Sequence, residues 1–135
     1  MGNYQLDKNQ NAQWIWYTKD AQNSAPAGTG KIFVYVYENN INLITCNINS
    51  IADNNVTIKV NNENVGTQSG GWGGSGGVVS APLIPGVNIF SFTATNTGDT
   101  PNPAGLLVTV FNPDNNQILF STGDNGWGYT YGSNL

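Results

Sequence analysis

Asn55-Val56-Thr57-Ile58-Lys59-Val60 has the clearest strand pattern of this chain. Its three β-branched apolar residues stand at every second position and alternate with polar residues. This period of two is typical of a strand with one face buried and the other in water. The next residues, 61–64, read Asn-Asn-Glu-Asn and suit a tight hairpin turn, because Asn tolerates positive φ at low cost.

The same alternation recurs along the rest of the 135 residues, with turn signals between the apolar runs. No stretch has a helical period with capping residues. Short strands at this spacing predict an all-β fold, an antiparallel β-sandwich of the jelly-roll type with about nine strands and no significant helix. The expected strands are Gln13–Thr18, Lys31–Glu38, Ile41–Ile48, Asn55–Val60, Val78–Leu83, Val87–Thr95, Gly105–Asn112, Gln117–Thr122 and Trp127–Tyr131.

Lys31–Glu38 differs from the other expected strands because large side chains occupy both of its faces. Such a strand is expected to lie centrally and be covered on both sides, or to place one face in an interface. Cys46 is the only cysteine, so no disulfide forms within the chain. It lies in an apolar run, and we predict a small buried hydrophobe rather than a reactive thiol.

The composition disfavours catalysis. The chain has no histidine but 22 asparagines and 17 glycines, and these two residue types cannot exchange protons near neutral pH. Charged residues make up 9% of the chain, compared with about 25% in an ordinary soluble protein. A weakly charged, amide-rich surface suits extracellular modules and packed assemblies, and we expect no enzyme activity.

Charge and hydropathy also exclude some partners. The four basic residues are well-separated lysines, the net charge is −4 and the pI is near 4.2, so we expect no nucleic-acid binding. No apolar run is long enough for a membrane-spanning helix, and Met1–Lys8 lacks the pattern of a secretory signal. The expected location is extracellular or on the surface of a virion. We expect an N-terminal arm at 1–11 and a single sandwich domain at 12–135.

Several blocks resemble galactose-binding-like jelly-roll modules. These modules occur as accessory domains of bacterial glycosidases of the α-L-rhamnosidase type, and in structural proteins of phages and large DNA viruses. Asn62 stands where the family's middle hairpin has a glycine. The resemblance implies the fold and a glycan-related or virion-surface role, but it transfers no binding site. It spans about residues 12–131 and rests on the blocks Ala12–Tyr17, Ala25–Thr29, Ala52–Gly66, Pro103–Leu107 and Ser121–Trp127.

The candidate ligand-binding residues are Trp72, Trp127 and the pair Asp53-Asn54. Trp72 lies in the glycine-rich segment 70–77, where an indole has little local packing and must dock elsewhere to offset its ordering entropy. It could stack on a sugar ring, plug the open end of its own core or insert into a neighbouring subunit. Trp127 is also flanked by glycines, and it could lie near Trp72 or close the far end of the sandwich.

Two further groups have simpler interpretations. Trp14 and Trp16 alternate with Ile15 and share one face, and core packing is favoured over an exposed aromatic pair. Three turn aspartates, Asp53, Asp99 and Asp124, could in principle offer oxygens to calcium, the only metal that this composition suits. However, no Asp-x-Asp-x-Asp spacing is present, so we interpret them as turn formers and predict no metal or other cofactor.

Two functions are compatible with these observations. The first is a non-catalytic structural or attachment module, a subunit of a virion, tail or extracellular assembly that contacts itself or other structural subunits. The alternative is a carbohydrate-binding, lectin-like module that uses the tryptophan-bearing glycine-rich loop. Neutral amides suit vicinal hydroxyl groups, and an indole supplies a stacking surface.

Overall fold

The computed structural model describes residues 9, 11–69 and 76–131. This part of the chain contains nine strands and no helix. The strands are β1 (Thr29–Asn39), β2 (Thr45–Asp53), β3 (Asn55–Val60), β4 (Glu63–Ser69), β5 (Gly77–Pro82), β6 (Gly86–Asn96), β7 (Gly105–Phe111), β8 (Ile118–Ser121) and β9 (Gly128–Tyr131).

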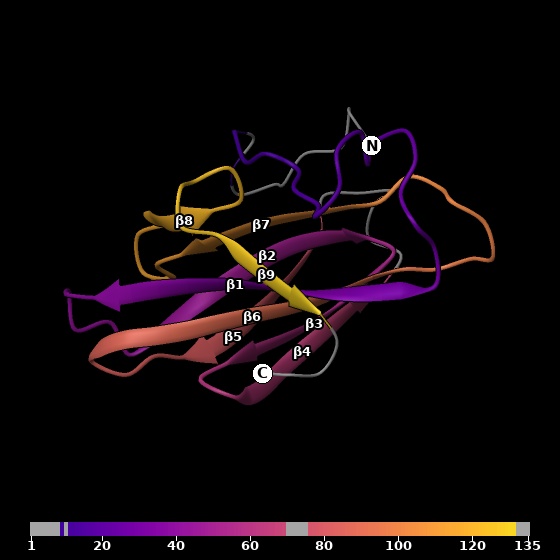
Figure 1. Cartoon of the computed structure of the whole chain (residues 1–135). Coiled ribbons are helices and arrows are strands. Elements are labelled where there is room, and N and C mark those ends of the chain that lie inside the picture. Colours follow the sequence, from indigo (N-terminus) through magenta and orange to yellow (C-terminus); the bar gives the residue numbers. More distant parts are fainter. Residues whose placement is uncertain (1–8, 10, 70–75, 132–135) are drawn as a thin grey trace.

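The strands form two antiparallel sheets stacked as a sandwich (Figure 1). One sheet has the order β4-β3-β6-β1-β9 and the other has the order β5-β2-β7-β8. The prediction of an antiparallel sandwich with about nine strands and no significant helix is therefore confirmed. The described residues contain no helix that could cross a membrane.

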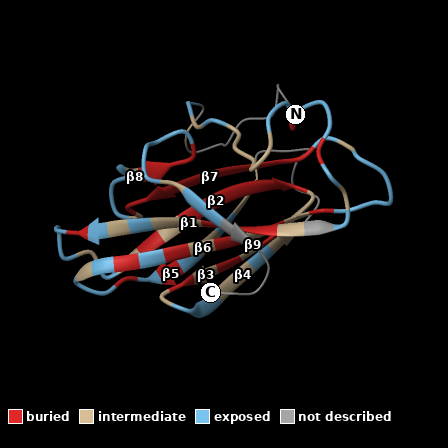
Figure 2. Cartoon of the chain, in the orientation of Figure 1, coloured by how far each residue is buried: buried red, intermediate tan, exposed pale blue. Residues whose placement is uncertain are grey.

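The core lies between the two sheets and is built from the alternating positions of their strands. β3 follows the predicted pattern, with Val56, Ile58 and Val60 buried in the core and the residues between them half-buried. β7 is buried at every position, so its outer face is covered as well (Figure 2). Cys46 is fully buried, as predicted, and burial raises the pKa of its thiol to about 12.

β1 lies between β6 and β9, and β9 pairs with Lys31–Val34. The predicted central position of Lys31–Glu38 is therefore confirmed for the first half of the strand. Phe33, Tyr35 and Tyr37 face the core, where the Tyr35 ring stacks on Phe120 at a centroid distance of 4.0 Å. The opposite face changes along the strand from the buried Ile32 to Val36, which is 56% exposed.

Two of the expected strands were wrong in part or in whole, and one strand of the structure was not expected. Gln13–Thr18 is not a strand, because it makes only one isolated bridge, between Ile15 and Leu106. β4 was not predicted, because its sequence ENVGTQS contains a single β-branched apolar residue. It forms because it pairs with β3 across the Asn61-Asn62 turn. β2 begins at Thr45 instead of Ile41 and continues through the polar residues up to Asp53.

Buried asparagines hold the loops at one end of the sandwich, which we call the turn end (residues 40–44, 61–62, 83–85 and 112–117). The side-chain amide of Asn39 donates to the carbonyls of Leu43 and Ile84 at 2.8 and 3.0 Å. Its carbonyl accepts from the Leu43 N–H. This pairing keeps residues 40–44 out of the sheet and explains the late start of β2. The Asn88 side chain in turn bonds both backbone groups of Ile84.

A second asparagine pair organises the opposite end, which we call the pocket end (residues 20–28 and 97–104). The amide of the fully buried Asn96 donates to the carbonyls of Ala25, Pro26 and Asn102 at 3.3, 3.0 and 3.2 Å. The Asn102 amide closes its own loop by donating to Thr97 and Thr100. The segment before β1 and the β6–β7 loop are therefore joined through side-chain amides.

Candidate functional site

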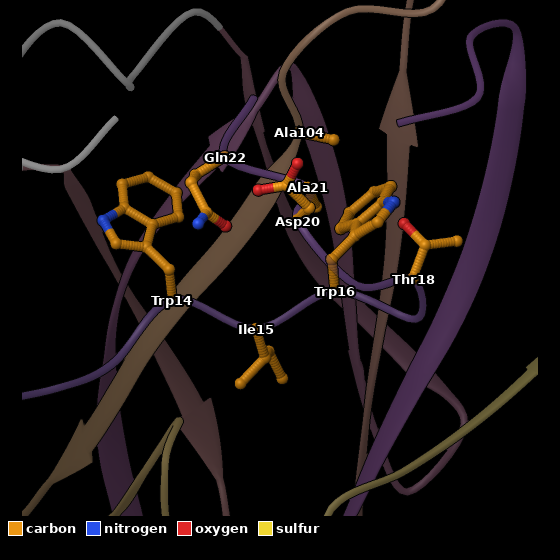
Figure 3. A pocket seen from close by; sticks show the side chains of 8 residues that line it. All are labelled: Trp14, Ile15, Trp16, Thr18, Asp20, Ala21, Gln22 and Ala104. Carbon is orange, nitrogen blue, oxygen red and sulfur yellow. The ribbon is translucent and has the colours of Figure 1, made fainter. Parts of the chain in front are cut away.

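A pocket of about 310 Å³ opens at the pocket end, between the segment that precedes β1 and the loop that leads into β7. Figure 1 places this segment (indigo) on the β7 side of the sandwich. The lining residues are shown in Figure 3 and are Trp14, Ile15, Trp16, Thr18, Asp20, Ala21, Gln22 and Ala104.

Backbone hydrogen bonds fix the lining segment on the sandwich. The Gln13 N–H donates to the Thr122 carbonyl at 3.0 Å, and Ile15 exchanges two bonds of 2.9 Å with Leu106. Further along, the Ala104 N–H donates to the Ala21 carbonyl at 2.9 Å. The segment is therefore held at both ends of the pocket although it is not part of a sheet.

Trp14 forms one wall of the pocket. Its indole packs against Ile51 and Leu107, which are register partners on β2 and β7. These two residues are fully or almost fully buried. Trp14 thus covers the outer face of the four-stranded sheet with one side and lines the pocket with another.

Trp16 forms the opposite wall. Its ring lies 5.5 Å from the Phe33 ring and 5.7 Å from the Tyr17 ring, measured between centroids. It also packs against the buried alanines Ala21, Ala25 and Ala104. Both indoles are half-buried, and Figure 3 shows them on the same side of the chain with Ile15 pointing away. The predicted shared face of Trp14 and Trp16 is confirmed, and each ring combines packing with a pocket wall.

Polar side chains lie between the two indoles. Figure 3 shows the Asp20 carboxylate and the Gln22 amide in this space. Asp20 has a φ of +62°, a conformation that Asp and Asn tolerate better than most residues. Its Oδ1 accepts from Asn23 Nδ2 at 2.7 Å, and its backbone carbonyl accepts from the N–H groups of Asn23 and Ser24. The turn therefore holds the carboxylate in place beside the pocket.

Three more polar atoms of the pocket wall have unused hydrogen-bonding capacity. Trp14 Nε1, Trp16 Nε1 and Thr18 Oγ1 are buried and have no hydrogen-bond partner in the part of the chain that the structure describes. Buried polar groups in proteins are nearly always paired. Among the described residues, three of the seven buried side-chain atoms without a hydrogen-bond partner therefore belong to residues that line this pocket.

A buried lysine, Lys31, contacts Tyr17, the aromatic neighbour of Trp16. Lys31 Nζ lies 4.4 Å from the centroid of the Tyr17 ring, and Tyr17 in turn contacts Trp16. A cation over an aromatic face is attracted by the ring quadrupole. Burial lowers the pKa of the Lys31 ammonium.

A second hollow of about 410 Å³ lies on the outer face of the five-stranded sheet and is lined by Asn61, Asn62, Ile89 and Ser91. It has no aromatic wall. The Asn61 side chain is already bonded to Asn88 Oδ1 and to the Ile89 N–H. The first pocket is therefore the better candidate, because it joins aromatic surfaces with uncommitted polar groups.

The structure places Trp127, predicted as a ligand contact, against the aromatic core. Its ring lies 5.2 Å from Tyr35, 5.6 Å from Phe92 and 6.0 Å from Phe120, between centroids. Its Nε1 donates to the Ser121 carbonyl at 3.0 Å. Trp72, the other predicted aromatic contact, lies outside the described residues.

The predicted pair Asp53-Asn54 lies at the connection between β2 and β3. Asp53 is buried and pairs with Gly105, and burial raises the pKa of its carboxyl. Asn54 Oδ1 accepts from the Thr97 N–H at 2.9 Å. A ligand contact by either stays a prediction.

The lining residues Thr18, Asp20 and Gln22 were not predicted. The available signal was local: a Trp-x-Trp pair followed within six residues by the polar side chains of Thr18, Lys19, Asp20 and Gln22. Among the described residues, no three His, Cys, Asp or Glu side chains gather closely enough to hold a metal ion. Asp124, one of the turn aspartates, accepts from the Ser121 N–H through Oδ2, which agrees with its interpretation as a turn former.

Comparison with known proteins identifies solved structures that share this fold. No protein-family model and no curated protein sequence matches the chain. A lectin from Pleurotus ostreatus, solved in complex with GalNAc, is similar with a TM-score of 0.70 and 19% identity. The match covers 87% of this chain and 35% of the lectin.

Two rhamnosidases are similar as well. The α-L-rhamnosidase of Streptomyces avermitilis, complexed with L-rhamnose, has a TM-score of 0.70 and 19% identity over 92% of this chain. The GH78 rhamnosidase of Bacillus sp. GL1 has a TM-score of 0.68 and 21% identity over 91% of this chain. The chain spans only 12% and 14% of these two enzymes, and about a third of the lectin. The predicted likeness to domains of rhamnosidases is confirmed for the fold, whereas the likeness to phage and virus proteins stays a prediction.

Proposed function

We propose that this chain is a non-catalytic carbohydrate-binding module that holds one sugar ring between Trp14 and Trp16. The observation that carries the proposal is the pocket itself, in which two indoles flank a carboxylate and an amide. The sequence had suggested carbohydrate binding as the alternative function, but through Trp72.

The chemistry of the pocket suits a sugar. The C–H faces of a pyranose pack on an indole, while its hydroxyl groups need hydrogen-bonding partners at the rim. The Gln22 amide offers a donor and an acceptor, and the Asp20 carboxylate offers acceptors. The volume of about 310 Å³ lies at the lower end of the range of ligand pockets, about 300–1,000 Å³, which suits a monosaccharide or a chain end.

The similar structures support the proposal by analogy of fold. One is a lectin solved with GalNAc and another is a rhamnosidase solved with L-rhamnose. One fold hosts many functions, so this analogy raises the expectation of a sugar without naming it.

Catalysis is not part of the proposal. Asp20 is the only ionisable side chain among the described residues that line the pocket. Glycoside hydrolysis usually needs two carboxyl groups on either side of the scissile bond. A single open site of this kind is expected to bind weakly, and useful affinity would come from several copies.

Titration of the chain with GalNAc, L-rhamnose and galactose, followed by ligand-observed NMR and by calorimetry, tests the proposal. Trp14→Ala and Trp16→Ala should each weaken binding at least about tenfold, because each removes one stacking wall. Ile44→Ala is the matched control: it removes an exposed apolar side chain at the turn end and should leave affinity unchanged. Binding that survives both tryptophan variants in folded protein would refute this site.

A structural-subunit role is the second candidate, and exposed aliphatic side chains favour it. Val36 and Ile89 are register partners on β1 and β6, and Val87 lies nearby on β6; all three are about half exposed. An apolar patch of this kind suits contact with another subunit. Light scattering after size-exclusion chromatography, compared between the native chain and Val36→Asp, tests it: a monomer at millimolar concentration in both would contradict it.

A further inference from the structure

We propose that Asp20 makes the two-tryptophan pocket select sugars by charge: it admits neutral sugars and amino sugars and rejects uronic and sialic acids. This inference rests on the proposed function and concerns the same pocket. The juxtaposition behind it is a carboxylate held between two indoles, with no basic side chain among the described lining residues.

Hydrogen bonds within the turn restrain the carboxylate. One of its oxygens accepts from Asn23 Nδ2, and the Asp20 carbonyl accepts from two backbone N–H groups of the same turn. The second oxygen, Oδ2, has no hydrogen bond within the described part of the chain. Because the turn sets the carboxylate in advance, a ligand that uses Oδ2 does not have to order this side chain.

A neutral sugar matches this arrangement. Its hydroxyl groups can donate to Oδ2, and a hydrogen bond to a charged acceptor is stronger than one between neutral groups. An amino sugar places an ammonium group where the carboxylate and both indole faces attract a cation.

An acidic sugar meets like charge, and no basic side chain among the described lining residues compensates for it. Lys19 is next to Asp20 in the sequence but is exposed and does not line the pocket. Lys31 is buried, its Nζ lies over the Tyr17 ring, and it is not among the residues that line the pocket. The net charge of the chain is −4, so the wider field adds to the repulsion. At contact distances of a few ångströms, two like charges at a partly exposed site change an affinity by about tenfold or more.

The experiment uses three probes with the same ring: galactose, galacturonic acid and galactosamine, and the corresponding gluco and manno sets. Affinities are measured by calorimetry at pH 7, in 0.05 and 0.3 M salt. We expect the amino sugar to bind at least as well as the neutral sugar, and the uronic acid about tenfold more weakly. Higher salt should narrow this difference, because it screens charge.

Asp20→Asn is the decisive variant, because Asn keeps the size of the side chain, tolerates the positive φ and can still accept from Asn23. The uronic acid should then bind within about twofold of the neutral sugar, and the preference for the amino sugar should disappear. Asp114→Asn is the matched control: it removes the same charge from the exposed turn at the other end of β7 and should leave the order of the three probes unchanged.

The outcomes separate the two proposals. Equal binding of galactose and galacturonic acid by the native chain, or an unchanged ratio in Asp20→Asn, would overturn charge selection and leave the sugar site intact. If neither the nine probes nor GalNAc and L-rhamnose bind the native chain, the proposed function fails and this inference fails with it.

Discussion

The backbone N–H and carbonyl of Ile15 are both hydrogen-bonded to Leu106, each at 2.9 Å, although the two residues are far apart in the sequence. This single bridge directs the Ile15 side chain into the core. The two neighbouring indoles point the other way, so Trp14 and Trp16 become the walls of the pocket (Figure 3). This pair of backbone hydrogen bonds therefore orients the alternating side chains of residues 14–16, so that the two indoles line the pocket.

Asn96→Ala should lower the free energy of unfolding by about 1–3 kcal/mol, because it removes a buried donor to three backbone carbonyls. The carbonyls of Ala25 and Asn102 keep a backbone N–H donor, whereas the Pro26 carbonyl loses the one that the structure describes. Urea unfolding measures this loss. Sugar affinity should also fall, because Asn96 joins the two segments that line the pocket. Asn40→Ala, an exposed asparagine, is the control and should change stability by less than about 0.5 kcal/mol. A stable Asn96→Ala variant would show that backbone pairing alone holds the pocket end.

Trp127→Ala should cost about 3–5 kcal/mol of stability, because the indole packs on three aromatic rings and donates to the Ser121 carbonyl. Thermal unfolding followed by near-ultraviolet circular dichroism measures this loss. Trp127→Phe should recover part of it. If Trp127→Ala kept its stability and lost only sugar binding, the residue would be the ligand contact that the sequence predicted.

Asn62→Gly should be neutral or slightly stabilising, whereas Asn62→Val should cost about 1–2 kcal/mol, because position 62 has a φ of +71°. The structure confirms that Asn62 takes the left-handed position at which the resembling family has a glycine. Asn40→Val, at an exposed position without a positive φ, controls for loss of an amide. Equal losses of stability in Asn62→Val and Asn40→Val would show that the loss comes from the missing amide side chain and not from backbone strain.

Cys46 should be inert to thiol reagents in the folded chain at pH 8, because burial raises its pKa from about 9.0 to about 12. In the unfolded chain the thiol ionises near pH 9. Its contribution to stability is therefore complete below pH 9 and is lost as the pH rises from 9 to 12. Comparing urea unfolding of the native chain and Cys46→Ala from pH 8 to 11 isolates this effect, and the native chain should show the steeper fall. Equal slopes would contradict it.

Much of the fold followed from local pattern. The alternation in β3 predicted its buried face, and the Asn61-Asn62 turn predicted the hairpin, because φ preference and side-chain direction act over a few residues. Local pattern gave wrong strand predictions where contacts between distant segments determine the structure. β4 carries almost no apolar signal and forms by pairing with β3, whereas Gln13–Thr18 has a strong signal but makes one bridge.

The composition and the alternation of polar and apolar residues were enough to give an all-β sandwich with asparagine turns, because each of these properties belongs to single residues and their neighbours. The pocket could not be derived in this way. Its walls, its carboxylate and Ala104 come together only when Leu106 and Asn96 bind the segment before β1, and these contacts join residues that are distant in the sequence. Sequence neighbours set the strands, and the packing of distant segments made the site.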